Sequence, residues 1–131
     1  MATKFNMTRD INGYNGFGLQ FTDTAYSATL TASTDTPVTV PSNSGMGGNG
    51  ISAQPLWLAV FSYDPGTSVW VSINTAAAAP AGASFAATQS ELNPAARLVK
   101  GKDNLGNAAD VIHFFSTGTA VNVSVSFWSL S

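Results

Sequence analysis

The chain has 131 residues, the common size of a single domain, and 44% of them are hydrophobic. It contains no cysteine, which excludes disulfides, a thiolate nucleophile and Cys-ligated metal sites. Charged residues make up only 9% of the chain and the formal net charge is -2, which argues against the uncompensated basic stripe of a nucleic-acid-binding protein.

The first residues, MATKFNMTRD, hold no apolar run of signal-peptide length. No segment reaches the roughly 18 consecutive apolar residues of a membrane span. We therefore expect neither Sec export nor membrane insertion. Because few charges leave little repulsion between copies, we expect surfaces that are occupied by partners.

Short alternating runs of β-branched and aromatic residues, separated by Gly, Pro, Asn and Asp, predict strands and no convincing helix. We expect residues 1–16 to form an N-terminal arm and residues 17–131 to form one β domain. Within that domain, alternation predicts half-exposed strands near 17–22, 26–32 and 38–40. The glycine-rich stretch SNSGMGGNG then predicts a surface loop, because it leads into a strand and not into the helix of a phosphate-binding motif.

Residues 55–63, PLWLAVFSY, are apolar on both sides of the predicted strand. One row holds Leu56, Leu58 and Val60, which we expect to face the core, and the other holds Trp57, Ala59, Phe61 and Tyr63. Asp64-Pro65-Gly66 predicts a tight turn, so this run and residues 68–74, SVWVSIN, should form a hairpin with Trp70 behind the row of Val69, Val71 and Ile73.

The rest of the chain continues this pattern. Pro80 and Gly82 interrupt the alanine-rich residues 76–87, which predicts an irregular connection. Strands are predicted at 96–100, at VIHFFS (111–116) and at 121–128, with a polar loop before VIHFFS. In the last strand Val121, Val123, Val125 and Phe127 alternate with Asn122, Ser124, Ser126 and Trp128.

These elements predict an all-β fold, a two-sheet sandwich of about eight antiparallel strands of jelly-roll type. An immunoglobulin-like sandwich is the alternative. The strand number and the absence of a Cys-Trp-Cys pattern favour the jelly roll.

Few residues are available for catalysis. The single histidine, His113, has no second histidine with which to hold a metal ion, and we expect it to bond locally. Asp10, Asp23, Asp35 and Asp64 stand beside turn residues and are expected to bond turn backbone. The stretch DNLGNAAD (103–110) has oxygen ligands without the spacing of an EF-hand. We expect no enzyme activity, catalytic residue, cofactor or metal; a hydrolase would require His113 to meet an Asp and a Ser in a pocket.

The aromatic residues opposite the aliphatic rows are the candidate site. We hypothesise that Trp57, Phe61, Tyr63, Trp70 and Trp128 form one interface patch. Three kinds of cover remain open for this patch. They are the chain's own arm, whose Phe5, Met7, Ile11 and Tyr14 need a resting place, a neighbouring subunit, and a sugar.

Five segments resemble small virion structural proteins of tailed bacteriophages: LTASTDTPVTVP, LWLAVFSYDPGTSVWVSIN, SELNPAARLVKGKD, DVIHFFSTG and VNVSVSFWSL, in this order over about residues 17–131. The resemblance implies a capsid decoration (cement) protein that binds the major capsid protein or another virion protein. It also implies a homo-oligomer, often a trimer, located in the virion after assembly in the host cytoplasm. No nucleic acid or membrane partner is expected. The alternative is a tail or head fibre module that binds a host receptor or glycan.

Overall fold

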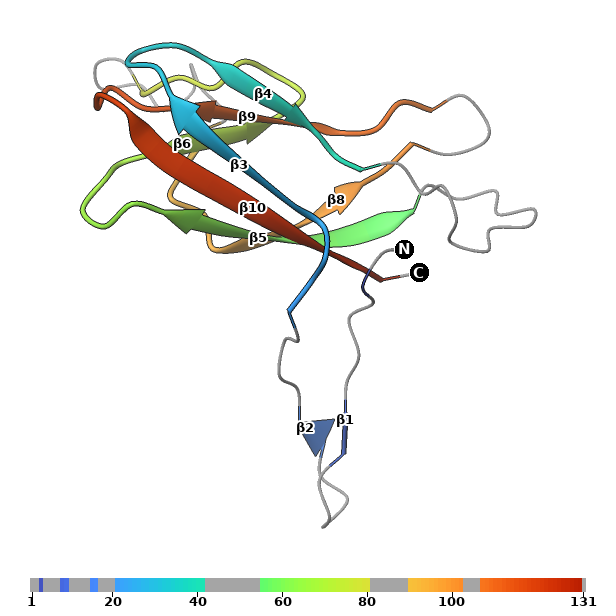
Figure 1. Cartoon of the computed structure of the whole chain (residues 1–131). Helices are drawn as coiled ribbons and strands as arrows, with labels where there is room; N and C mark the ends of the chain where they lie inside the picture. The colour runs from blue at the N-terminus through green and yellow to red at the C-terminus, as the bar shows by residue number, and fades with distance from the viewer. Residues whose placement is uncertain are drawn as a thin grey trace.

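The computed structural model describes residues 3, 8–9, 15–16, 21–41, 55–80, 90–102 and 107–130 (Figure 1). All regular elements in these ranges are strands: β1 (Thr8–Arg9), β2 (Asn15–Gly16), β3 (Ala25–Leu30), β4 (Thr36–Thr39), β5 (Leu56–Tyr63), β6 (Trp70–Ile73), β7 (Glu91–Leu92), β8 (Ala96–Lys100), β9 (Val111–Phe115) and β10 (Val121–Ser129). No helix of this part of the chain is long and apolar enough to span a membrane.

Two four-stranded sheets form the sandwich. The first sheet has the strand order β3-β10-β5-β8 and the second has the order β4-β9-β6-β7, and every pairing is antiparallel. β1 and β2 pair separately in a short ladder, which Figure 1 draws apart from the two sheets. The prediction of an all-β, two-sheet sandwich of about eight antiparallel strands is therefore confirmed.

The first half of the sandwich pairs with the second half in reverse order. β3 pairs with β10, β4 with β9, β5 with β8, and β6 with β7. This is the pairing of a two-stranded ribbon rolled into two layers, and we interpret it as a jelly roll.

The predicted hairpin between residues 55–63 and 68–74 is wrong. The turn itself forms, since Gly66 has a φ of 73° and the Thr67 amide donates to the Asp64 carbonyl at 3.4 Å. However, β5 pairs with β10 and β8 in the first sheet, whereas β6 pairs with β9 and β7 in the second. The turn is thus a corner between the layers, because strands distant in sequence take both sides of β5.

Other strand predictions mostly hold where the structure describes the residues. β3, β4, β8, β9 and β10 lie in predicted runs. Residues 21–24, by contrast, form no strand, and the Phe21 side chain is exposed. Residues 17–20, the glycine-rich loop at 42–50 and residues 81–89 lie outside the described residues, and the division into an arm and a domain stays a prediction.

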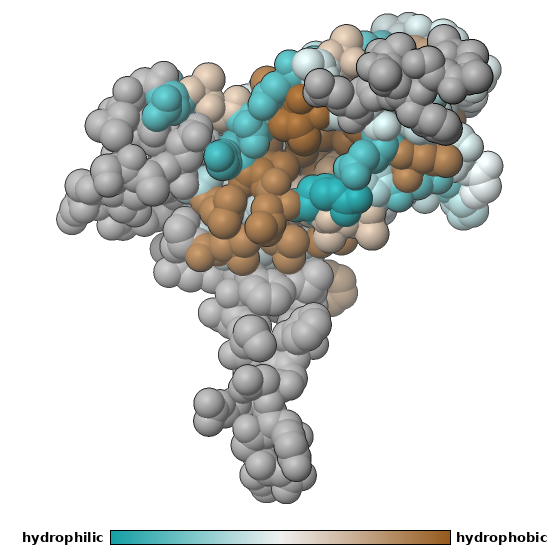
Figure 2. Space-filling model, turned by 180° about the vertical axis from the view of Figure 1, so that it is seen from behind, coloured by the Kyte–Doolittle hydropathy of each residue, from teal (hydrophilic) through white to brown (hydrophobic). Residues whose placement is uncertain are grey.

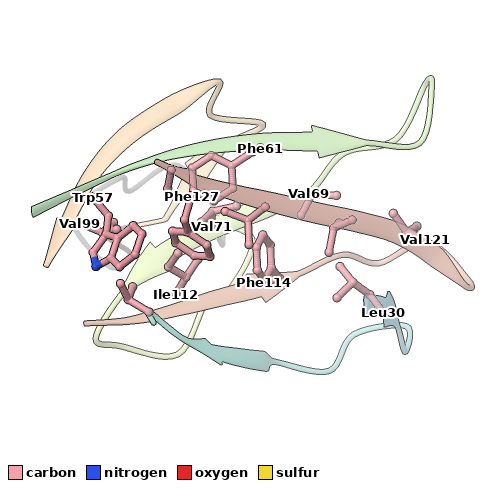
Figure 3. Packing of buried hydrophobic residues seen from close by; sticks show 14 residues of the cluster. Leu30, Trp57, Phe61, Val69, Val71, Val99, Ile112, Phe114, Val121 and Phe127 are labelled. Carbon is pink, nitrogen blue, oxygen red and sulfur yellow. The ribbon is translucent and has the colours of Figure 1, made fainter. Parts of the chain in front are cut away.

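The core lies between the sheets and is rich in aromatic rings (Figure 3). Trp57 and Phe127 meet edge to face with centroids 6.2 Å apart, and Phe61 and Phe114 do so at 6.1 Å. The prediction that the aliphatic row of β5 faces the core is wrong. Trp57, Ala59 and Phe61 are buried, while Leu56, Leu58 and Val60 are half-buried on the outer face.

Candidate interaction surfaces

The aromatic residues of the predicted interface patch lie in three different places: the core between the sheets and the two outer faces of the sandwich. Trp57 and Phe61 are core residues, with 1% and 7% of their surfaces exposed. Because they fill the space between the sheets, they are not available to a partner. The prediction that Trp57, Phe61, Tyr63, Trp70 and Trp128 form one common patch is therefore wrong.

Tyr63 lies on the inner side of β5 at the rim of the core. Its ring stacks on Phe61 with an interplanar angle of 5°, and its hydroxyl donates to the Pro94 carbonyl at 2.7 Å. Burial raises the pKa of the Tyr63 hydroxyl above its usual range. Tyr63 thus ties β5 to the connection between β7 and β8.

Trp70 and Trp128 point away from the core on opposite sides of the sandwich. Trp70 is half-buried on the outer face of the second sheet, where its register neighbours are Leu92 and Phe115. Trp128 lies on the outer face of the first sheet opposite Leu58, and only 7% of its surface is exposed. The interface role of these two residues stays a prediction.

The outer face of the first sheet carries a continuous apolar surface, which we call the first outer face. Strand register places Leu98, Leu58 and Trp128 in one row across β8, β5 and β10. Ala96 and Val60 form the next row, and Leu56 pairs with Lys100. Leu98 is 61% exposed, and Figure 2 shows hydrophobic residues gathered in one area on the surface of the sandwich. Large apolar patches of this kind mark interaction sites.

One part of the arm meets the end of this sheet. The Ser129 amide donates to the Thr3 carbonyl at 2.7 Å, and the Thr3 hydroxyl donates to the Asp23 carboxylate at 3.2 Å. The arm therefore reaches the strand end that carries Trp128. The predicted covering residues Phe5, Met7, Ile11 and Tyr14 lie outside the described part of the chain.

The outer face of the second sheet, which we call the second outer face, is crossed by the connection that follows β6. The Ala77 amide donates to the Asp35 carboxylate at 2.9 Å, and the Ala78 amide donates to the Ser90 hydroxyl at 3.1 Å. Asp35 precedes β4 at one edge of the sheet, whereas Ser90 precedes β7 at the other. Ala77 is buried, so residues 75–80 form a partial third layer.

His113 lies on the second outer face. Its Nδ1 is 2.8 Å from the second carboxylate oxygen of Asp35, so Asp35 joins the imidazole to the Ala77 amide. Ser72 is the register neighbour of His113. However, Ser72 is buried and its hydroxyl donates to the Thr75 carbonyl. The described residues thus bring together an acid and an imidazole, while the nearby serine hydroxyl is bonded elsewhere. This arrangement fastens the covering connection to the sheet.

The carboxylates of Asp64 and Asp110 also accept backbone amides. Asp64 accepts the Asn122 amide at 2.8 Å, and Asp110 accepts the Lys100 amide at 2.9 Å. Asp110 also accepts the Asn74 side-chain amide at 3.0 Å, which links its loop to the end of β6. Asp35 and Asp64 accept backbone amides, but those amides belong to Ala77 and Asn122, far away in the chain, and not to the neighbouring turns as expected. The Asp23 carboxylate accepts the Thr3 and Thr24 hydroxyls. Among the described residues no cluster of three or more His, Asp or Glu side chains suits a metal ion, and Asp10 and Asp103 lie outside them.

An ion pair joins the two sheets where β7 and β8 approach. Arg97 donates to both Glu91 carboxylate oxygens, at 2.9 and 3.0 Å. These hydrogen bonds lower the pKa of Glu91, and both side chains remain about half exposed.

Sequence reasoning missed the first outer face because it assigned the row of Leu56, Leu58 and Val60 to the core. One signal was available in β8, where Leu98 shares its row with Lys100, and a lysine is rarely buried. This signal shows that Leu58 also faces outward only when the register that pairs Leu58 with Leu98 is known.

Comparison of the chain with protein-family models, curated proteins and solved structures finds no match. The function is therefore proposed from the residues and their geometry.

Proposed function

We propose that the protein is a non-enzymatic structural component of a bacteriophage virion, a capsid decoration or cement protein that stabilises the particle through surface contacts. The observation that carries this proposal is the first outer face, with its exposed Leu98 in a chain of very few charges. The resemblance of five sequence segments to small virion proteins is the reason for proposing a bacteriophage particle as the partner.

The physical role follows from the composition of this surface. Burying Leu98, Leu58 and their neighbours against a capsid subunit removes apolar surface from water, which stabilises by roughly 25 cal/mol per Å². A stable contact buries roughly 1,200 to 2,000 Å² in total. With a net charge of -2, attachment depends on apolar burial and hydrogen bonds more than on electrostatic attraction.

Reconstitution tests the proposal. Purified protein is added to particles assembled without it, and the bound copies are counted. A copy number near that of the major capsid protein supports decoration, whereas a handful of copies supports a tail or fibre position. A chain that neither binds particles nor self-associates in light scattering contradicts the proposal.

Two matched variants locate the contact. Leu98→Asp places a charge on the first outer face and is expected to weaken particle binding at least tenfold. Leu92→Asp is the control, because Leu92 is 49% exposed on the second sheet. Equal losses in both variants would remove the first outer face from the proposal.

A fibre module that binds a host receptor or glycan is the second candidate. The half-buried Trp70 favours it, because sugars stack on aromatic rings, and Phe115 lies beside it in the next strand. This candidate predicts glycan-array binding that Trp70→Ala abolishes. An array without hits speaks against it.

A further inference from the structure

The two sheets have four edge strands, and three of them carry features that oppose pairing with another strand. These edge strands are β3 and β8 in the first sheet and β4 and β7 in the second. Exposed edges are templates for added strands, and proteins block them with prolines, charges or short strands. The differences among the four edges therefore indicate where another chain can pair.

β4 is blocked by a proline. The Val40 amide donates to the Asp110 carbonyl, so the backbone groups of Val40 point toward β9. Because alternate residues of a strand direct their backbone N–H and C=O groups to opposite sides, those of Pro37 point away from β9, to the edge of the sheet. Proline has no amide hydrogen, so this position cannot donate to an added strand. β7 has only two residues, one of them Glu91.

β8 is blocked by side chains. Its Lys100 amide donates to the Asp110 carboxylate and its Lys100 carbonyl accepts the Asp110 amide, both at 2.9 Å. The Arg97 guanidinium also donates to the Ala96 carbonyl at 2.6 Å. Outward-directed backbone groups of this strand are thus already used at both ends.

β3 lacks these features. Its sequence, AYSATL, contains no charge, proline or glycine. The Phe127 amide donates to the Thr24 carbonyl, so the alternation directs the backbone groups of Tyr26, Ala28 and Leu30 toward β10. Ala25, Ser27 and Thr29 direct theirs to the open edge, and all three residues are exposed. Within the described ranges β10 is the only strand that pairs with β3.

We propose that β3 pairs antiparallel with β3 of a second copy of this chain, about a twofold axis at Ser27. In this register Ser27 faces Ser27, and Ala25 faces Thr29 of the second copy. Each facing pair exchanges both backbone hydrogen bonds, so all outward groups of the strand find partners. The four-stranded first sheets of the two copies then form one continuous sheet. The inference needs only a second copy, so it does not depend on the proposed function.

The side chains of β3 fit this pairing. Tyr26 is 45% exposed and, in the proposed register, stands beside Ala28 of the second copy. Ala28, Val38 and Phe114, together with the chain's own Tyr26, line a shallow apolar surface between the sheets, and the Tyr26 ring of the second copy can pack against its edge. The nearest charge, Asp23, lies four residues from Ser27 along the chain. The two Asp23 carboxylates would be about 27 Å apart, well beyond the Debye length of about 8 Å at physiological salt.

Cysteine cross-linking tests the register, and the natural chain has no cysteine to interfere. In Ser27→Cys the two facing Cα atoms would be about 5.5 Å apart, which suits a disulfide. In Ala25→Cys they would be about 14 Å apart, which does not. We expect mild oxidation to convert most of Ser27→Cys to a covalent dimer and to leave Ala25→Cys uncross-linked. A mixture of Ala25→Cys with Thr29→Cys should cross-link as a heterodimer.

Sedimentation of the cysteine-free chain provides an independent measurement. We expect an even-numbered assembly, and we expect Ser27→Pro, which removes one outward amide, to weaken it at least tenfold. Circular dichroism checks that this variant folds; if it does not, Ser27→Lys, which places like charges opposite each other, replaces it. Equal cross-linking of Ser27→Cys and Ala25→Cys, a strict monomer, or a trimer would overturn the proposal.

Discussion

The two outer faces of the sandwich differ in how their apolar residues are covered. On the second outer face, residues 75–80 lie over the sheet and are held by the Asp35 carboxylate, which binds both the Ala77 amide and His113. On the first outer face, Leu98 of the edge strand remains 61% exposed beside Leu58. Residues 75–80 thus cover the second outer face, whereas on the first outer face Trp128 is buried and the exposed apolar surface lies toward the edge strand, at Leu98.

This difference separates two uses of polar residues. Asp35 and His113 on the second outer face stabilise the chain's own layer, whereas the described rows of the first outer face carry Lys100 and no carboxylate. The half-buried Asp35 carboxylate therefore serves to hold a segment of the chain in place by hydrogen bonds. The first outer face, which lacks such a carboxylate, is the candidate surface for contact with other molecules.

The largest expected effect comes from the inner row of β5. Trp57→Ala removes a side chain that is 1% exposed and should lower the free energy of unfolding by about 3 to 5 kcal/mol. Leu58→Ala, one residue away on the first outer face, should lower it by about 1 kcal/mol. Urea denaturation measures both values. A larger loss for Leu58→Ala would reverse the assignment of inner and outer rows.

The cover of the second face can be released selectively. Asp35→Ala removes the acceptor of the Ala77 amide and the partner of His113, and should lower stability by about 1 to 3 kcal/mol. Hydrogen exchange at Ala77 should accelerate at least tenfold, while the core amide of Val71 changes only with global stability. Asp23→Ala, at an exposed carboxylate, is the control. Unchanged exchange at Ala77 would mean that other contacts hold the connection.

Alkaline pH should weaken the rim of the core near Tyr63. Because burial raises the pKa of Tyr63 in the folded state, its contribution is fully present below the ordinary tyrosine pKa of about 10 and is lost as pH rises toward the folded value. Tyr63→Phe should cost about 1 kcal/mol at neutral pH through its lost bond to Pro94 and should flatten the alkaline loss. Thermal unfolding between neutral and alkaline pH measures this difference. An equally steep alkaline loss in the variant would assign it to another group.

The smallest effect is expected at the exposed ion pair. Hydrogen bonds from Arg97 lower the pKa of Glu91, so the pair contributes above the ordinary glutamate pKa of 4.5 and is lost as pH falls through the lower folded value. Since about half of each side chain is exposed, Glu91→Gln should cost only a few tenths of a kcal/mol, and less at high salt. Acid titration of stability at low and high salt checks this. A cost above about 1 kcal/mol would indicate a larger role at the junction of the sheets.

The sequence by itself determined the fold class and most strands. Alternation in β10 correctly placed Val121, Val123, Val125 and Phe127 on the inner face, because only one row of that strand is uniformly apolar. The turn at Asp64-Pro65-Gly66 was also predictable, since its residues adopt the needed backbone angles locally.

Only the tertiary structure decided which row of β5 is inside, which sheet β6 joins and which edge is open. Both rows of β5 are apolar, so local pattern cannot distinguish them; pairing with β8, where Lys100 stands opposite Leu56, makes the aliphatic row the outer one. A turn sequence likewise does not specify whether its strands pair or separate into two layers. These choices depend on contacts between residues far apart in the chain, which local pattern does not encode.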